Sequence, residues 1–117
     1  MKIAIAQLNP TVGDIEGNFS KALAARETAR TEGADLVVFP ELFLAGYPPE
    51  DLVLKPSFQQ ACQDALLELA KETAGDDGPG LLIGTVWPEE GKVYNAVALI
   101  DGGEVAALRF KVCLLYT

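Results

Sequence analysis

Two short segments, residues 2–8 and 35–39, constrain the fold most, because they are apolar at nearly every position. An extended chain points successive side chains to opposite faces, so a strand formed by either segment is apolar on both sides. Strands of this kind are typically buried on both faces in layered α/β folds. The two segments therefore predict strands of an α/β protein that need a covering layer on each side.

Two helices are expected beside these strands. Apolar residues at helical spacing predict one over residues 18–32, with Asn18 as its N-cap and Gly33 at its end. The second is expected over residues 57–74, with Ser57 as its cap and the clearest apolar stripe of the chain. The residues expected to be buried are Phe19, Ala22, Leu23, Ala25 and Ala29 on the first helix, and Phe58, Ala61, Cys62, Ala65, Leu66, Leu69 and Ala70 on the second.

Three further strands are expected over residues 80–86, 93–101 and 104–110, and the residues Asp-Gly-Gly at 101–103 predict a hairpin between the last two. The order β-α-β-α-β-β-β predicts parallel early strands and antiparallel later ones, and hence an α/β fold with a mixed sheet. Two helices are too few to cover both faces of this sheet. We therefore expect a further layer, and with it a larger fold to which this chain belongs.

Charge and composition narrow the classes of partner. The 117 residues carry 9 Lys+Arg against 17 Asp+Glu, a formal net charge of −8. This surface repels nucleic acid and anionic membranes, so neither is expected as a partner. The chain begins with a strand pattern in place of a signal peptide, which predicts a cytoplasmic protein. There is no histidine, which excludes Ser-His and Cys-His triads and most zinc sites, and no metal site is expected.

Glu41 is the first candidate for chemistry. It follows the apolar strand 35–39 and Pro40, at the carboxyl end of a strand, where open α/β sheets place their ligand crevices. Apolar surroundings disfavour a charged carboxylate and raise its pKa, as suits a general base. The alternative is a helix-capping or surface glutamate outside the core.

Five other residues are weaker candidates on position alone. Lys111 follows the last strand, where a lysine is usually a solvated edge residue. Asn95 begins a strand, and its amide is expected to satisfy a loop backbone. Tyr47 and Asp51 either shape the mouth of a pocket or hold their loop. Cys62 lies on the apolar stripe of the second helix and is expected to be a small core residue.

Three segments together resemble the nitrilase, or carbon–nitrogen hydrolase, superfamily. They are residues 1–14, residues 36–42 with their Phe-Pro-Glu, and the pair Tyr94-Asn95. The loop over residues 46–52, Gly-Tyr-Pro-Pro-Glu-Asp-Leu, narrows the resemblance. It is similar to the loop of the amino-terminal glutaminase domains of glutamine-dependent NAD synthetases, and the match runs to about Val112.

This resemblance implies an α-β-β-α sandwich, of which the chain is an incomplete part, and a Glu-Lys-Cys triad. Glu41 corresponds to the general base and Lys111 to the lysine that stabilises the oxyanion. Tyr47 is a candidate substrate-binding residue from its place in the loop alone. The cysteine would attack the amide of glutamine and release ammonia. The ammonia would pass to a carboxy-terminal synthetase domain that uses ATP and Mg²⁺ to amidate nicotinic acid adenine dinucleotide. No cofactor is expected within residues 1–112.

The family pattern stops after Val112. Cys113 is unsuited as the nucleophile, because the family cysteine comes from a separate strand further along the chain and a chain terminus holds no side chain rigidly. We therefore predict that residues 1–112 are the amino-terminal part of a hydrolase domain and that residues 113–117 are a non-native tail. Without the nucleophilic cysteine, the chain itself is expected to be inactive.

Three functions remain open at this point. The first is the glutaminase part of an NAD synthetase. The second is a free-standing carbon–nitrogen hydrolase, an amidase or nitrilase, for another small amide, since Glu41 and Lys111 serve both equally. The third is a non-catalytic binding domain. The protein is also expected to be a homo-oligomer.

Overall fold

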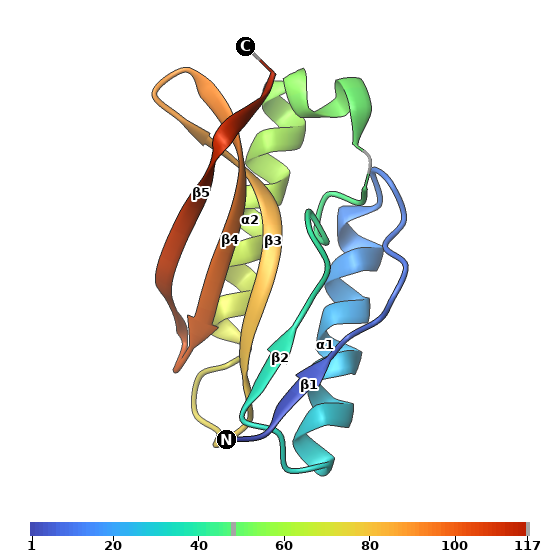
Figure 1. The fold of residues 1–117 in the computed structure, drawn as a ribbon, viewed down its shortest axis with the longest axis vertical. Helices are drawn as coiled ribbons and strands as arrows, with labels where there is room; N and C mark the ends of the chain where they lie inside the picture. Colours follow the sequence, from blue (N-terminus) through green and yellow to red (C-terminus); the bar gives the residue numbers. More distant parts are fainter. Residues whose placement is uncertain (48, 117) are drawn as a thin grey trace.

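The computed structural model describes residues 1–47 and 49–116, with the backbone alone at residue 50 and residues 112–116. Its elements are β1 (Ile3–Ile5), α1 (Ile15–Thr31), β2 (Leu36–Val38), the 3₁₀ helix η1 (Glu50–Leu54), α2 (Pro56–Lys71), β3 (Gly80–Glu89), β4 (Lys92–Asp101) and β5 (Glu104–Tyr116). The five strands form one sheet in the order β1-β2-β3-β4-β5 (Figure 1). β1, β2 and β3 are parallel, whereas β3, β4 and β5 are antiparallel. This confirms the predicted α/β fold with a mixed sheet.

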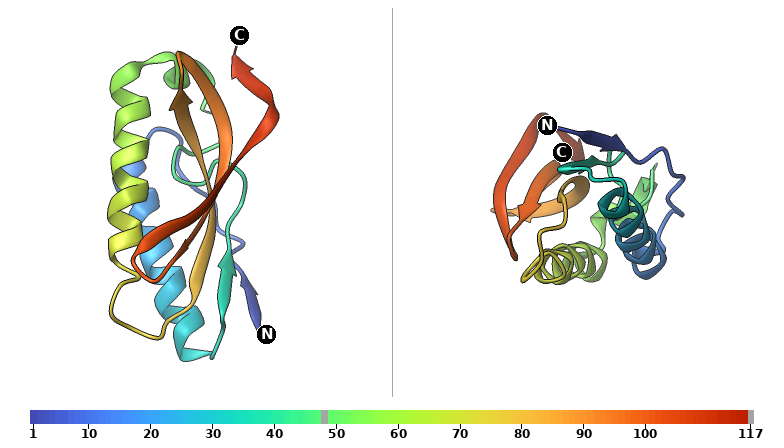
Figure 2. Two further views of the ribbon diagram at one scale, coloured as in Figure 1. Left: turned by 90° about the vertical axis from the view of Figure 1, so that its left-hand side faces the viewer. Right: turned by 90° about the horizontal axis from the view of Figure 1, so that it is seen from below.

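Both helices lie on the same face of the sheet, and Figure 2 shows the two layers from the side and from below. The core lies between these layers, where Val37, Leu81 and Ile83 are fully buried or nearly so. On the opposite face of β1, Ile3 and Ile5 remain 52% and 70% exposed. The two helices thus cover one face only, as the strand pattern predicts. Burial of the strands on both faces is not reached within the described residues.

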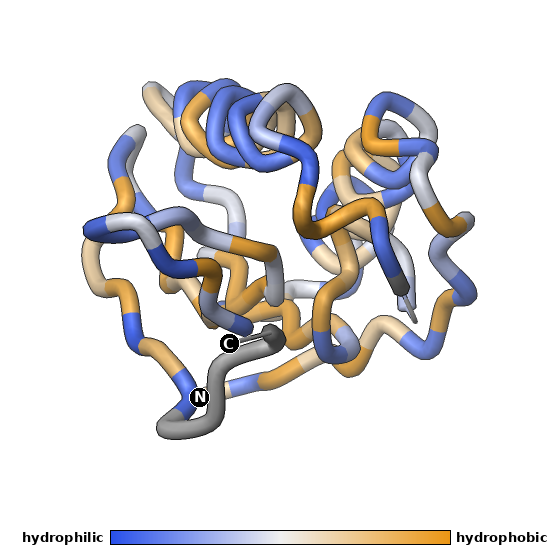
Figure 3. Tube along the Cα trace, turned by 90° about the horizontal axis from the view of Figure 1, so that it is seen from above, coloured by the Kyte–Doolittle hydropathy of each residue, from blue (hydrophilic) through white to orange (hydrophobic). Residues whose placement is uncertain are grey.

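Hydrophobic and hydrophilic residues alternate around the two helices (Figure 3). Of the residues expected to be buried on α2, Phe58, Cys62, Leu66, Leu69 and Ala70 are buried, whereas Ala61 is exposed. No helix of the described residues is both long enough and apolar enough to cross a membrane.

α1 begins earlier than predicted. Asp14 is its N-cap and accepts a hydrogen bond from the backbone amide of Gly17 at 2.9 Å, so the prediction of Asn18 as cap is wrong. Asn18 is fully buried and exchanges hydrogen bonds of 2.8 Å with the backbone of Thr11 in both directions. It also donates to the carbonyl of Leu44 at 3.1 Å. Because its amide both donates and accepts, Asn18 joins the segments that follow β1 and β2.

α2 also differs at its ends. Pro56 is its first residue, and Lys55 occupies the N-cap position without a side-chain hydrogen bond, so Ser57 is not the cap. Proline is favoured at the first position of a helix for two reasons. Its fixed backbone angle fits the helix, and the N–H that it lacks would have no acceptor within the helix at this position. The helix ends at Lys71, three residues before the predicted end.

A buried arginine joins α1 to the turn after α2. The guanidinium of Arg26 donates to the carbonyl of Pro79 at 2.9 Å and forms an ion pair with Asp76 at 2.8 Å. The hydrogen bond from Arg26, and after it one from the backbone amide of Gly78, lowers the pKa of Asp76 to about 2. The sequence pattern did not predict this contact. The apolar residues around Arg26 indicate a buried face of the helix, but they give no sign that an arginine is buried there.

Replacing Arg26 by methionine tests this contact. Arg26→Met leaves the buried carbonyl of Pro79 without its donor, so we expect the free energy of unfolding to fall by about 2 kcal/mol. The matched control is Arg30→Met on the same helix, whose exposed pair with Glu27 contributes less than about 0.5 kcal/mol. Urea unfolding measures both variants, and equal losses would contradict this role of Arg26.

Candidate active site

Three polar side chains that lie far apart in the sequence meet on one carboxylate. Lys111 Nζ and Asn95 Nδ2 both donate a hydrogen bond to Oε1 of Glu41, across 70 and 54 residues of chain. We call Glu41, Asn95 and Lys111 the carboxylate site. They line a cavity of about 280 Å³ whose other lining residues are Phe39, Pro40, Gly84, Ala96, Val97, Arg109 and Phe110.

Glu41 owes its position to a tight turn after β2. The amide of Phe39 donates to the carbonyl of Leu82 at 2.9 Å, and the amide of Leu44 donates to the carbonyl of Gly84 at 3.2 Å. The turn therefore hydrogen-bonds to β3 at both ends. Between these bonds Leu42 has a φ of 53°, which is unfavourable for leucine, and its side chain is fully buried. Burial of Leu42 holds the turn that presents Glu41.

Gly84 permits this turn to lie against β3. A Cβ atom on Gly84 would be 2.5 Å from the amide nitrogen of Leu42 and 3.2 Å from the carbonyl carbon of Glu41. Only glycine leaves enough space at this position. Gly84 was not predicted as a site residue from the sequence, although a glycine within an apolar strand is the signal that marks a close backbone approach.

Asn95 and Lys111 come from neighbouring strands at an irregularity in their pairing. β4 and β5 shift register between Tyr94 and Ala96, and the rings of Tyr94 and Phe110 stack beside it with centroids 4.7 Å apart. Such irregularities redirect side chains and are frequent next to active sites. Here two strands direct one donor each to the same carboxylate oxygen.

The electrostatics of Glu41 differ from the prediction. The hydrogen bond from Lys111, and then that from Asn95, holds the pKa of Glu41 below its ordinary value, while burial acts in the opposite direction and is outweighed. The side chains of Glu41 and Lys111 are 42% and 59% exposed. The expectation of a raised pKa is therefore wrong, although burial acts in the expected direction, and Glu41 is ionised at neutral pH.

The remaining residues singled out from the sequence have different outcomes in the structure. Asn95 does not satisfy a loop backbone with its amide, because the amide is bound to Glu41. Tyr47 is exposed and, like Asp51, is not among the residues that line the cavity; Pro48 between them lies outside the described residues. Cys62 is a buried core residue as predicted, and burial raises the pKa of its thiol to about 12. The side chain of Cys113 lies outside the described residues.

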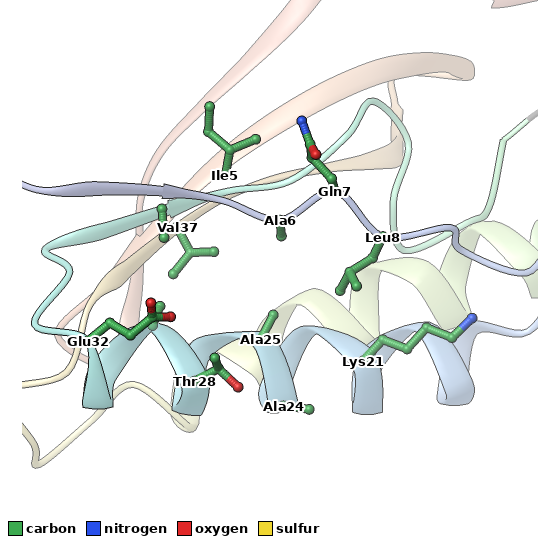
Figure 4. Close-up of a pocket in the computed structure, with 12 residues that line it drawn as sticks. Ile5, Ala6, Gln7, Leu8, Lys21, Ala24, Ala25, Thr28, Glu32 and Val37 are labelled. Carbon is green, nitrogen blue, oxygen red and sulfur yellow. The ribbon is translucent and has the colours of Figure 1, made fainter.

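A second cavity, of about 400 Å³, lies between β1 and α1 (Figure 4). Small and apolar residues line its middle, and Lys21 and Glu32 lie at its two ends. The ammonium group of Lys21 donates to the carbonyl of Asn9 at 2.9 Å. Because Lys21 and Glu32 lie at opposite ends of this cavity, it does not bring an acid and a base together. Within residues 1–47 and 49–116 there is also no group of three or more His, Cys, Asp or Glu side chains that fits a metal ion.

The chain is thus an α/β protein in which a glutamate at the carboxyl end of the parallel strand β2 pairs with a lysine of the antiparallel strand β5. Residues 2–115 match the family model described as carbon-nitrogen hydrolase. The chain belongs to this family.

Among curated relatives, the chain is similar to the glutamine-dependent NAD(+) synthetase of Thermotoga maritima, with 44% identity over 114 residues. These residues are 97% of this chain and 19% of the relative. The glutamine-dependent NAD(+) synthetase of Rhodobacter capsulatus is 46% identical over 110 residues, 94% of this chain and 20% of the relative. The chain thus spans about a fifth of the length of these relatives.

Two kinds of solved structure have the same fold. The glutamine-dependent NAD+ synthetase from Acinetobacter baumannii superposes with a TM-score of 0.87 at 33% identity, over 98% of this chain and 21% of that one. An amidase from Nesterenkonia sp. superposes with a TM-score of 0.80 at 28% identity, over 100% of this chain and 44% of that one.

The pKa of Glu41 provides a direct test of the carboxylate site. Lys111→Met removes the main cause of the lowered pKa, so we expect the midpoint of the Glu41 carboxyl titration to move to higher pH. The matched control Lys92→Met, on the exposed end of β4, is expected to leave the midpoint unchanged. NMR titration of the labelled side-chain carboxyl carbon measures it, and an unchanged midpoint in Lys111→Met would disprove the pairing.

Proposed function

We propose that residues 1–112 are the amino-terminal part of a carbon–nitrogen hydrolase domain that releases ammonia from glutamine within a glutamine-dependent NAD synthetase. The observation that carries the proposal is the contact of Glu41 with Lys111, in a chain whose curated relatives are synthetases of this kind. Amide hydrolysis by a thiol requires a general base and a group that stabilises the oxyanion, and an ionised carboxylate and a positive charge can fill these two roles.

In this proposal Glu41 and Lys111 have separate tasks. Glu41 takes the proton of a cysteine thiol, and the thiolate attacks the carbonyl carbon of the glutamine side chain. Lys111 stabilises the negative charge that develops on the carbonyl oxygen. The carbon–nitrogen bond breaks, ammonia leaves with the transferred proton, and a thioester remains. Glu41 then activates the water that hydrolyses the thioester.

The nucleophilic cysteine would come from residues beyond this chain. One structure of the Nesterenkonia amidase is a Glu-to-Gln mutant in which acrylamide is added to the active site cysteine. The open face of the sheet, where Ile3 and Ile5 are exposed, provides room for a second layer carrying such a residue. Tyr47, on the loop after Glu41, would contact the substrate at the mouth of the completed site.

The remaining parts of the longer protein would hold the other substrates. We propose that its synthetase domain uses ATP and Mg²⁺ and amidates nicotinic acid adenine dinucleotide. The solved Acinetobacter baumannii synthetase is a complex with ADP, which supports an adenine nucleotide site in proteins of this kind. Residues 113–117 would be a non-native tail, as predicted from the sequence.

A free-standing amidase for another small amide is the second candidate. It is favoured by one observation, the superposition of the whole chain on an amidase of which it covers 44%. In both candidates Glu41 and Lys111 have the same chemical roles. The candidates differ in substrate and in the presence of a synthetase domain.

The test uses the full-length protein that carries this chain. Glu41→Gln is expected to lower glutamine-dependent NAD formation by about a hundredfold or more, because the general base is lost. Formation of NAD from free ammonia should remain within about twofold, since it bypasses the amide hydrolysis. Coupled assays with glutamine and with ammonium chloride measure the two rates.

The matched control is Glu90→Gln, on the exposed turn between β3 and β4, which should leave both rates unchanged. Full glutamine-dependent activity in Glu41→Gln would refute the proposed role of Glu41. Hydrolysis of another small amide with no activity on glutamine would favour the amidase.

A further inference from the structure

Asn95 is the third member of the carboxylate site and has no role in the chemistry described above. It lies on β4, between β3 and β5, and is 7% exposed. Its backbone pairs with Val86 of β3. A short side chain on a central strand has little freedom, so its amide is held in one place.

Both donors of the carboxylate site end on the same oxygen. Lys111 and Asn95 donate to Oε1 of Glu41, and among the described residues no hydrogen bond of the structure ends on Oε2. A carboxylate accepts a proton through a lone pair of one of its oxygens. With Oε1 occupied twice, Oε2 is the oxygen left to accept the proton.

Lys111 is less suited than Asn95 to keep this arrangement during the reaction. Its side chain is long and 59% exposed, and in the proposed hydrolysis its ammonium group also serves the oxyanion. As Lys111 divides its donors between two acceptors, the bond from Asn95 to Oε1 persists. The buried amide therefore fixes the orientation of the carboxylate while the lysine responds to the substrate.

We propose that Asn95 is a positioning residue that holds Oε1 of Glu41 by a hydrogen bond, so that Oε2 is the atom that takes the thiol proton and later activates water. This inference rests on the proposed hydrolase function and assigns the roles of the two oxygens within it. It requires an amide donor at position 95. Aspartate has the same shape but repels the carboxylate, and alanine leaves Oε1 to the lysine alone.

The charged groups that line the same cavity are Lys111 and Arg109, both on β5. Both are cationic, and Lys111 favours the ionised form of Glu41, so neither explains a rise of its pKa. Loss of the Asn95 donor, or its replacement by a carboxylate, raises the pKa of Glu41. The acid limb of the pH profile for kcat/KM then moves to higher pH.

The experiment compares Asn95→Asp with the unmodified full-length protein in glutamine hydrolysis. We expect kcat to fall by about thirtyfold, which is less than the loss expected when the general base itself is removed. KM should change by less than about threefold. The acid limb should move up by about one pH unit. Formation of NAD from free ammonia should not change. The matched control Asn9→Asp, at an exposed residue that does not line the cavity, should behave as the unmodified protein.

A second pair of variants separates hydrogen bonding from packing. Asn95→Ser and Asn95→Ala are nearly equal in size, but only serine has a donor, so we expect serine to be at least about fivefold more active. If both variants also lose the ammonia-dependent activity, they have lost the fold. A crystal structure of the unmodified full-length protein then tests the proposal. The amide of Asn95 must then bind one oxygen of Glu41 and leave the other open to the cysteine.

The proposal is overturned if Asn95→Asp retains kcat and the acid limb while Glu41→Gln is inactive, or if serine and alanine are equally active. An amide of Asn95 turned away from Glu41 in the crystal structure would also overturn it. If Glu41→Gln itself remains active, the proposed function fails. That outcome is distinct from a failure of the role of Asn95.

Discussion

The position of one carboxylate oxygen, Oε1 of Glu41, depends on four of the five strands. Glu41 follows β2, its turn hydrogen-bonds to β3, and its two donors come from β4 and β5. Gly84 allows the turn to contact β3, and the buried side chain of Leu42 holds an unfavourable backbone angle beside it. A change in the register of any of these strands would separate the groups, so the sheet is the scaffold that assembles the site.

Polar contacts complete a core that covers only one face of the sheet. Asn18 joins the segments after β1 and β2, and Arg26 joins α1 to the turn after α2. Both lie on the layer of helices, away from the open face that carries Ile3 and Ile5. The helices therefore leave the carboxylate site and the open face uncovered, in a chain that spans about a fifth of the length of its synthetase relatives.

Local patterns in the sequence predicted the strands, both helices and the mixed sheet, because apolar periodicity determines which faces are buried. The resemblance to the hydrolase family supplied roles for Glu41 and Lys111, and the structure brings these two residues together. Asn95, Gly84 and the direction of the Glu41 pKa were not predicted correctly. Each depends on contacts between segments far apart in the chain, which only the register of the sheet creates. Asn18 and Arg26 were missed because buried polar residues interrupt an apolar stripe without a periodic signal of their own.

The most direct measurement is a crystal structure of the full-length protein after reaction with an electrophilic glutamine analogue that labels the nucleophilic cysteine. If Glu41 is the base and Lys111 stabilises the oxyanion, the labelled sulfur lies within about 3.5 Å of the Glu41 carboxylate, and the carbonyl oxygen of the analogue faces Lys111. A labelled cysteine remote from both residues would contradict the assignment of this site to amide hydrolysis.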